Sequence, residues 1–410
     1  MDATPETAAQ RFVAIDAHKA YVMIGAVDAQ QNVVLEPRRV DLAQFPTWIA
    51  KNLAPSDAVA LEVTTTAWHL YDQLCARGCA VVIANPLAVK LIAETAVKTD
   101  RRDTLTLARL LACGFLPTIW VPPLHVRQLR NLVARRERLV RQRTQARNRL
   151  HAILIRHAIV VPEGGLFTAR QRAWWEGLSL DPDERLVVRQ DLAWLDTLAE
   201  WIAELERELA RLSATSPWDQ ELPFLPQLPG MGTITAMTVL SAVGDIGRFP
   251  SAKKLVGYAG LGSSVHRSGT EQYGGRITKQ GRKELRTAMV EVAWRAVTTS
   301  AYWEEQFRPL ARRLGDNKAI VAIARKLLMA VWHVLTKAEA DRFAEPARVA
   351  RKLLTYTYLV GRVNRRPGQS TAQWVREQLD RLKLGAKLTE IDHGRRPIAL
   401  PPSTLTSKLT

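Results

Sequence analysis

Short apolar runs and amphipathic segments alternate along the first 120 residues. The stretch from Arg11 to Val40 predicts two or three short strands, with the polar residues 28–32 as a turn. Further strands are expected over 58–63 and 79–85, and helices over 45–52, over 67–76, from Leu87 and from about Arg101. A hairpin followed by alternating strands and helices predicts an α/β sheet domain, which should end at the double proline of residues 122–123.

Helical periodicity replaces this alternation from residue 125 onward. Leucines and valines between 129 and 150 form an apolar stripe at helical spacing, in a segment that extends to residue 157. A second segment, 183–213, carries leucines at heptad-like intervals, so we expect the two to pair as a long helical hairpin or coiled coil. Three tryptophans of this region are expected in the core or between helices, with stacking on single-stranded RNA as the alternative: Trp174, Trp175 and Trp201.

A proline-rich junction leads into a third, mostly helical region. Residues 228–245 resemble a helix-hairpin-helix segment, in which a P-G-x-G turn opens an apolar helix. Such a turn directs N–H groups of Gly230 and Gly232 at phosphate, although a tight turn without a ligand explains the motif equally well. Helices are expected over 282–299 and 318–335, followed by a loosely ordered tail. The expected divisions are 1–123, 124–215 (basic helical linker), 216–345 and 346–410 (a C-terminal helix and the tail).

Charge separates the first domain from the rest. The net charge is +18, yet residues 1–120 hold 11 Lys and Arg against 12 Asp and Glu, so the excess lies downstream. A polyanionic partner, most often nucleic acid, is the natural interpretation. No apolar run reaches the ~18 residues that span a membrane, no secretory signal is recognisable, and the three cysteines form no metal-spaced set. A cytoplasmic, nucleoid-associated protein without a membrane partner is expected.

The arginines of the 125–157 segment are too numerous for one salt-bridged face, because a single acid, Glu137, interrupts them. They are therefore candidates for contacts with an RNA or DNA backbone. The candidates are Arg127, Arg130, Arg135, Arg136, Arg138, Arg141 and Arg143.

Four carboxylates could meet at one edge of the predicted sheet. Asp16 and Glu62 end apolar strands, where a carboxylate is unfavourable unless exposed, paired or metal-bound. Asp100 and Asp103 lie one turn apart at the start of a helix, on one face. Oxygen ligands of this kind suit Mg²⁺ or Mn²⁺ in phosphodiester chemistry. Acids at a helix start are also favoured by the helix dipole alone, so a purely structural role stays open.

The segment 262–286 is rich in glycine, hydroxyl groups and basic residues, which is untypical of a core. Ser268 is its candidate nucleophile, and a serine hydroxyl needs activation to act as one. Cations around it would suit the charge of a phosphoryl-transfer transition state. The residues alone favour the alternative of a flexible phosphate-binding loop in which Ser268 only donates a hydrogen bond. The basic candidates are Arg267, Arg276, Lys279, Arg282 and Arg286.

Two long stretches of the chain resemble one protein family. VAIDAHK, ALEVTTTAWHLYDQL and NPLAVKLIAETAVKTDRRDTLTLARLL are similar to the N-terminal domain of the DEDD transposases of the insertion sequence 110 and 1111 group. The stretch from LPGMG at residue 228 to about residue 293 resembles the same family's C-terminal domain. Together they cover most of residues 11–300 in the family's order.

The resemblance implies an RNase H-like (RuvC-like) fold in front, with Asp16, Glu62, Asp100 and Asp103 as its metal-binding catalytic set. It implies a coiled-coil linker and a catalytic serine at the RSG motif, Ser268. It further implies exchange of donor and target DNA strands guided by a non-coding bridge RNA. A dimer to tetramer is implied, in which the carboxylates of one subunit meet the serine of another.

Two other classes stay possible from the sequence. One is a RuvC-type metal-dependent junction nuclease that hydrolyses DNA without a covalent intermediate. The other is a non-catalytic basic protein that binds nucleic acid and whose acids are structural. A covalent protein–DNA adduct separates the first from a recombinase, and loss of activity on removing one carboxylate excludes the second.

Overall fold

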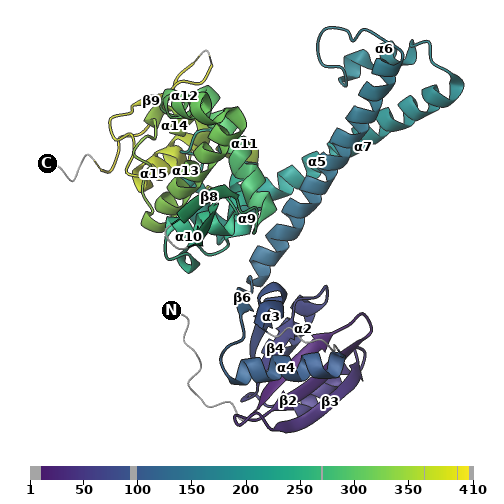
Figure 1. Ribbon diagram of the computed structural model, residues 1–410. Helices are drawn as coiled ribbons and strands as arrows, with labels where there is room; N and C mark the ends of the chain where they lie inside the picture. Colours follow the sequence, from purple (N-terminus) through teal and green to yellow (C-terminus); the bar gives the residue numbers. More distant parts are fainter. Residues whose placement is uncertain (1–10, 93–98, 269–270, 364, 395, 406–410) are drawn as a thin grey trace. The chain divides into compact units, whose positions relative to one another are not determined.

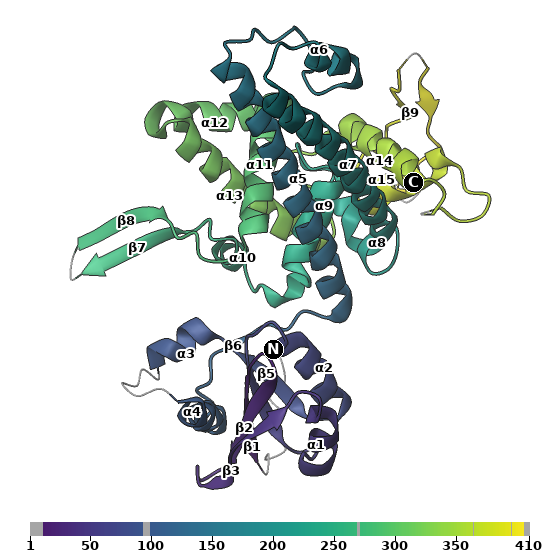
Figure 2. The same ribbon diagram turned by 90° about the vertical axis from the view of Figure 1, so that its right-hand side faces the viewer.

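The computed structural model describes residues 11–92, 99–268, 271–363, 365–394 and 396–405, and the side chains of 265–274 lie outside that description. The chain forms two compact units, residues 1–123 and 124–410 (Figures 1 and 2). The first is a mixed α/β domain and the second is largely helical. This confirms the predicted fold class at that level.

The first unit contains a six-stranded sheet with the strand order β3-β2-β1-β4-β5-β6. β2 is antiparallel to both of its neighbours, β1 and β3. β4 is parallel to β1, β5 is parallel to β4, and β6 is antiparallel to β5. The strands are β1 (Phe12–Ala17), β2 (Tyr21–Val27), β3 (Val33–Asp41), β4 (Ala58–Glu62), β5 (Ala80–Ala84) and β6 (Thr118–Ile119).

Helices cover both faces of this sheet. On one face α1 (Phe45–Asn52) and α2 (Ala67–Ala76) pack on the side chains of Val13 and Ile15. On the other, α4 (Asp100–Ala112) packs on Ala14, Ala60 and Ala84. The short helix α3 (Pro86–Ile92) follows β5. Because side chains alternate along a strand, the residues that share parity with Ala14 and Ala60 face α4.

The second unit begins with a long helical hairpin. α5 (Leu124–Arg156) pairs with α7 (Pro182–Ser213), and η1 (Ala169–Gln171) and α6 (Arg172–Glu176) lie at its tip (Figure 1). Acids of α7 meet arginines of α5: Arg136 binds Glu206 with two nitrogens, and Arg149 Nε donates to Asp191 at 2.9 Å. The predicted pairing of the two helices is confirmed.

The rest of this unit packs around α13 (Asp316–Lys337), which contacts α10, α11 and α12. Among the described residues it is the one helix long and apolar enough to cross a membrane. Its Ile323, Leu327 and Leu328 are fully buried, as expected of a central core helix. The remaining helices are α8 (Trp218–Glu221), η2 (Leu222–Phe224), α9 (Thr233–Val243), η3 (Ile246–Arg248), α10 (Ala252–Tyr258), α11 (Lys283–Thr299), α12 (Ala301–Leu314), α14 (Pro346–Val360) and α15 (Thr371–Arg381).

The prediction of a loosely ordered C-terminal tail is wrong for the described residues up to 405. Arg376 of α15 is 4% exposed and donates to the carbonyls of Pro401, Gly385 and Leu388. Asp380 accepts hydrogen bonds from the hydroxyl groups of Ser403 and Thr404. The short strands β9 (Glu390–Ile391) and β10 (Ile398–Ala399) pair in the same segment. A polar composition predicts disorder, but the buried Arg376 and the half-buried Asp380 fix the backbone here.

Glu221 supplies a pH-dependent test of the packing in this unit. Burial, followed by the charge of Asp245, raises the pKa of Glu221 from 4.5 to about 7. The folded state therefore holds the proton more tightly than the unfolded state, and stability falls as pH rises from about 4.5 through about 7. We expect Glu221→Gln to stabilise the protein at pH 8 by on the order of 2 kcal/mol and to have little effect at pH 4.5.

Urea unfolding of both proteins across this pH range measures the difference. Glu200→Gln, an exposed acid of α7, is the matched control and should change stability little at any pH. An effect of Glu221→Gln that is the same at pH 4.5 and pH 8 would contradict the raised pKa.

Candidate active site

The four predicted carboxylates gather on the α4 face of the first unit. Asp16 and Glu62 share strand parity with Ala14 and Ala60, so they face α4 from two neighbouring parallel strands. α4 begins at Asp100, after Thr99 caps it by accepting the Arg102 N–H. Asp103 follows one turn later. The residue pattern therefore directs all four toward one edge of the sheet.

His18 lies between two of these carboxylates. Its Nε2 is 3.3 Å from Asp16 Oδ2 and 3.2 Å from Asp100 Oδ2. The hydroxyl of Tyr21 donates to Asp100 Oδ2 at 3.2 Å, and the Tyr21 ring stacks on the His18 ring at 4.5 Å. The backbone N–H of His18 donates to the Tyr21 carbonyl in the turn between β1 and β2. This turn fixes the histidine beside the acids.

The other carboxylates border a small cavity. Its volume is about 120 Å³, and its lining includes Asp16, Glu62 and Asp103 together with Lys90 of α3. Thr106 and Leu107 of α4 close the wall opposite the sheet. Asp16 therefore belongs to both groups: it faces His18 and Asp100 on one side and Glu62 and Asp103 on the other.

The negative charge of Asp16 is disfavoured by burial and by neighbouring carboxylates. Burial is the largest cause that raises the pKa of Asp16, and the charges of Asp100 and Asp103 raise it further. His18 opposes these effects but does not cancel them. Such crowding of carboxylates is unfavourable in the protein alone and is relieved when a cation binds between them.

The residues fit a divalent metal ion. One oxygen each of Asp16 and Asp100 and one nitrogen of His18 lie within 4.8 Å of one another. His18 Nε2 is buried and makes no hydrogen bond among the described residues, although it lies beside two carboxylates. Oxygen ligands with one imidazole suit Mn²⁺, and the carboxylates suit Mg²⁺.

His18 is the residue whose importance the sequence analysis missed. From sequence, both His18 and His69 are expected to be packing groups or to lie behind the ligands. His69 is exposed and contacts Gln73 of its own helix, α2, so it is neither a packing group nor part of the Asp16–His18–Asp100 group. For His18 the available signal was its position two residues after Asp16, which keeps both side chains on the same side of the chain.

Ser268 lies at the end of a β-hairpin rather than in a loop. β7 (Ser263–Ser268) pairs antiparallel with β8 (Glu271–Ile277), and Ser268, the last residue of β7, is opposite Glu271. The described backbone of this segment is therefore a pair of strands, while the role of Ser268 stays a prediction. The side chains of Ser268 and Arg267 lie outside the described residues. Nearer the hairpin's base, Ser264 Oγ donates to the Arg276 carbonyl at 3.2 Å.

Three arginines predicted to contact nucleic acid also make hydrogen bonds within the fold. Arg130 donates to the carbonyls of Ser241 and Ala242 at the end of α9, where unsatisfied helix carbonyls attract cations. Arg282 Nε donates to the Tyr258 hydroxyl, and Arg286 donates to the Ala259 carbonyl. Burial lowers the pKa of Arg130 to about 10, which reflects how far this guanidinium is removed from water.

The remaining basic candidates differ in exposure. Arg136 and Arg141 are ion-paired to Glu206 and Glu137, and Arg135 lies over the Trp201 ring. Arg127 and Arg143 are half-buried. Arg138, Arg276 and Lys279 are exposed. These three exposed residues are therefore the most accessible of the predicted basic contacts.

The P-G-x-G turn precedes α9 as predicted. Gly230 has a positive φ of 79°, and Gly232 caps the N-terminus of α9. A cavity of about 600 Å³ lies beside them, lined also by Arg295, Arg348 and Lys352. The Lys352 ammonium donates to the carbonyls of Pro226, Leu228 and Met231 and thereby fixes this turn.

Comparison with known proteins identifies two matching family models. A model of DEDD transposases of the IS110 type, described as Transposase, matches residues 13–158. A second, described as Transposase IS116/IS110/IS902 family, matches residues 223–308. Together they span more than half of the chain, and the first contains all four carboxylates.

Individual relatives agree with these models. A putative transposase of Sinorhizobium fredii is 27% identical over 73% of this chain and 74% of its own. The transposase for insertion sequence element IS1111A of Coxiella burnetii is 25% identical over 81% of this chain and 91% of its own. A pilin gene-inverting protein of Moraxella bovis is 27% identical over 74% and 88%. The chain therefore belongs to the IS110 and IS1111 family of DEDD transposases, and it is a DNA transposase and recombinase.

Proposed function

We propose that this recombinase cuts and rejoins DNA strands by phosphoryl transfer at the carboxylate site, with Ser268 as the nucleophile. The observation that carries the proposal is the convergence of Asp16, Glu62, Asp100 and Asp103 on one face of the sheet. The strand order, with three antiparallel strands followed by two parallel ones, supports an RNase H-like fold. The α5–α7 hairpin is then the family's coiled coil.

Asp16, Glu62, Asp100 and Asp103 would hold Mg²⁺ or Mn²⁺, and His18 would complete the set on one side. When bound, the metal lowers the barrier by stabilising charge on the attacking and leaving oxygens. Tyr21 and His18 hold the Asp100 carboxylate in position by contacts of 3.2 Å each. Lys90, on the cavity wall, is placed to face a DNA phosphate.

The proposed covalent step is a transesterification. The Ser268 oxygen attacks a DNA phosphorus, a P–O bond of the backbone breaks, and the leaving strand departs with a free hydroxyl group. The phosphoserine ester conserves the bond energy, so the hydroxyl of another strand can attack it and release the serine. The position of Ser268 at the end of β7 supports this role, because the end of a strand can approach DNA closely.

The partners follow the family resemblance. We propose that donor and target DNA are aligned by a bridge RNA and that the protein acts in the bacterial or archaeal cytoplasm, on nucleoid DNA. Assembly as a dimer to tetramer would bring the serine of one subunit to the carboxylates of another. The exposed basic residues Arg138, Arg276 and Lys279 are the proposed backbone contacts, with the Gly230–Gly232 turn as a further phosphate site.

A covalent-capture assay tests the nucleophile. Protein, end RNA of the element, donor and target DNA and Mg²⁺ are incubated and separated on a denaturing gel. We expect a protein–DNA adduct from the wild type and at least about a thousandfold less from Ser268→Ala, because alanine cannot form the ester.

Ser264→Ala is the matched control, because Ser264 lies on the same strand and its hydroxyl donates within the hairpin. It should retain the adduct. Cleavage without an adduct in the wild type, unchanged in Ser268→Ala, would instead identify a hydrolytic junction nuclease.

A further inference from the structure

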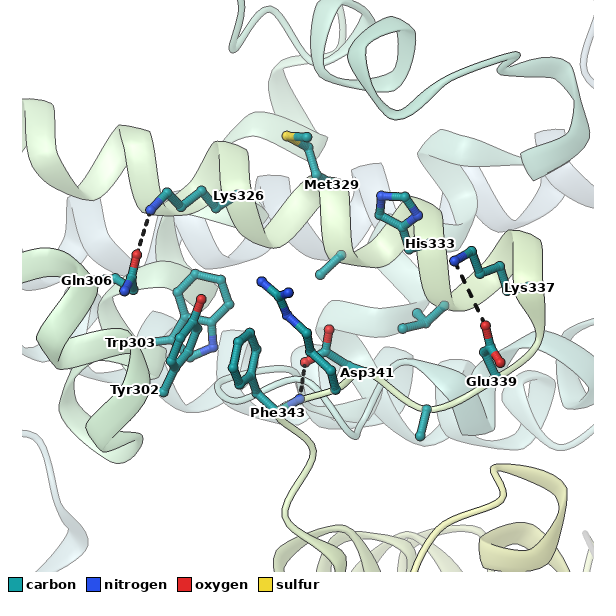
Figure 3. Close-up of a pocket in the computed structure, with 14 residues that line it drawn as sticks. Tyr302, Trp303, Gln306, Lys326, Met329, His333, Lys337, Glu339, Asp341 and Phe343 are labelled. Carbon is teal, nitrogen blue, oxygen red and sulfur yellow. Dashed lines mark hydrogen bonds and ion pairs between the residues drawn. The ribbon is translucent and has the colours of Figure 1, made fainter.

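A further cavity in the second unit is lined by none of the proposed catalytic residues. It has a volume of about 660 Å³, within the range of about 300–1,000 Å³ typical of small-ligand sites. α12, α13 and the connection from α13 to α14 form it (Figure 3). None of the residues that line it was predicted to have a function from the sequence.

One wall of this cavity is a stack of planar groups. The rings of Tyr302 and Phe343 are 3.6 Å apart with an angle of 19° between their planes. The Arg342 guanidinium carbon is 4.5 Å from the Phe343 ring centre. Since Tyr302 occupies one face of Phe343, the guanidinium occupies the other. The stack therefore ends in an exposed guanidinium plane that lines the cavity.

Apolar and cationic groups complete the cavity. Met329, Ala330 and Val334 of α13 form an apolar side, and His333 lies beside them (Figure 3). Lys326 donates to Gln306 at 2.8 Å, and Lys337 lies 4.0 Å from Glu339. The second acid, Asp341, already accepts the backbone N–H of Phe343. The lining thus contains three cations and two acids; Lys337 pairs with Glu339, while Lys326 is bonded to a neutral amide.

The cavity is held in shape from behind. Gln227 is 2% exposed, and its amide nitrogen donates to the Glu339 carbonyl. Its amide oxygen accepts the backbone N–H of Asp341 at 2.6 Å. Trp303, 4% exposed, packs beneath the stack. A ligand would therefore meet a preformed wall and lose little binding free energy to ordering it.

We propose that this cavity binds an unpaired nucleotide of a nucleic-acid strand, with the base stacked on the free face of the Arg342 guanidinium, which Phe343 supports from behind, and the phosphate beside Lys326. Aromatic and guanidinium planes are the groups on which proteins stack splayed bases, and the cations match the adjacent backbone. The ligand chemistry is common to single-stranded RNA and single-stranded DNA. The inference rests on nucleic-acid binding by this family and not on the proposed serine or metal chemistry.

Fluorescence of 2-aminopurine tests the site, because the fluorescence of this base is quenched when it stacks. Eight-nucleotide single strands of RNA and of DNA, each with one internal 2-aminopurine, are titrated with the full-length protein in EDTA. EDTA prevents catalysis, so failure here is distinguishable from failure of the catalytic proposal. Quenching by RNA alone would identify an RNA segment as the occupant, and quenching by DNA alone a displaced DNA strand.

Variants assign the quenching to the cavity. Phe343→Leu removes the ring but keeps an apolar side chain. Arg342→Gln changes an exposed residue and is expected to fold, so it tests the cavity even if Phe343→Leu does not fold. Each is expected to weaken binding by about fivefold or more and to reduce quenching. Arg325→Gln, an exposed α13 arginine outside the cavity, should bind as the wild type does.

Two outcomes overturn the proposal. One is equal quenching and affinity in the wild type and in both cavity variants. The other is unchanged strand binding combined with loss of self-association in the variants, which would make this cavity a protein–protein contact.

Discussion

Asp16→Asn is expected to reduce DNA cleavage and strand exchange by about a thousandfold or more while DNA affinity stays within about twofold. Asp16 is the residue common to both halves of the site, since it faces His18 and Asp100 as well as the cavity with Glu62 and Asp103. An amide is nearly the same size but lacks the negative charge. The variant therefore lowers the affinity for metal without changing the volume of the side chain.

The stability of this variant separates a catalytic role from a structural one. Burial and the nearby acids raise the pKa of Asp16, so its charge is unfavourable in the folded protein without metal. Asp16→Asn should then melt, in EDTA, at the same temperature as the wild type or above it. Loss of activity together with a higher melting temperature is the signature of a site where function opposes stability.

Asp72→Asn provides the control in the same unit. Asp72 lies on α2, on the opposite face of the sheet from α4, and is exposed. This variant should retain both activity and DNA binding. Strand exchange by Asp16→Asn at the wild-type rate would exclude the carboxylate site as the catalytic centre, and the family's acids would then be structural in this chain.

Strand parity and helix starts were sufficient to predict the acidic cluster. The alternation in VAID and ALE puts Asp16 and Glu62 on one face, and a helix that starts at Asp100 adds two more acids beside them. Both rules concern residues that are close together along the chain, so they can be applied to a single sequence. The contact of His18 with Asp100 depends instead on the tight turn to Tyr21 and on where α4 packs, which no local pattern specifies.

For charged residues the sequence could not show the hydrogen-bond partners within the fold, because these partners are distant along the chain. Arg130 binds carbonyls more than a hundred residues away, and Arg376 fixes a tail whose composition is typical of disorder. An arginine count predicts a polyanion partner for the whole chain but cannot separate a structural guanidinium from an exposed one. Arg138 and Arg276 are exposed, whereas Arg130 is half-buried and donates to two carbonyls.

Gly230→Ala is expected to destabilise the second unit by about 3 kcal/mol, because two separate costs add. Gly230 has a φ of +79°, a conformation that is unfavourable for alanine by about 1–2 kcal/mol. A Cβ atom there would lie 2.5 Å from the Val292 carbonyl oxygen and 2.8 Å from Arg295 Cβ, so α11 would have to move. Thermal unfolding should show a decrease of roughly 5–10 °C.

Gly232→Ala decides between the two interpretations of the P-G-x-G turn. Gly232 has a φ of −103°, a Cβ atom would meet nothing within 4 Å, and the residue lines the cavity at the N-terminus of α9. Its stability should change by less than about 1 kcal/mol. If the turn binds phosphate, a methyl group there hinders the approach of the backbone, and DNA affinity falls while the protein stays folded. If the glycines serve packing alone, Gly232→Ala binds DNA as the wild type does. Gly230→Ala is then the only one of the two variants with weaker DNA binding, because it is less stable.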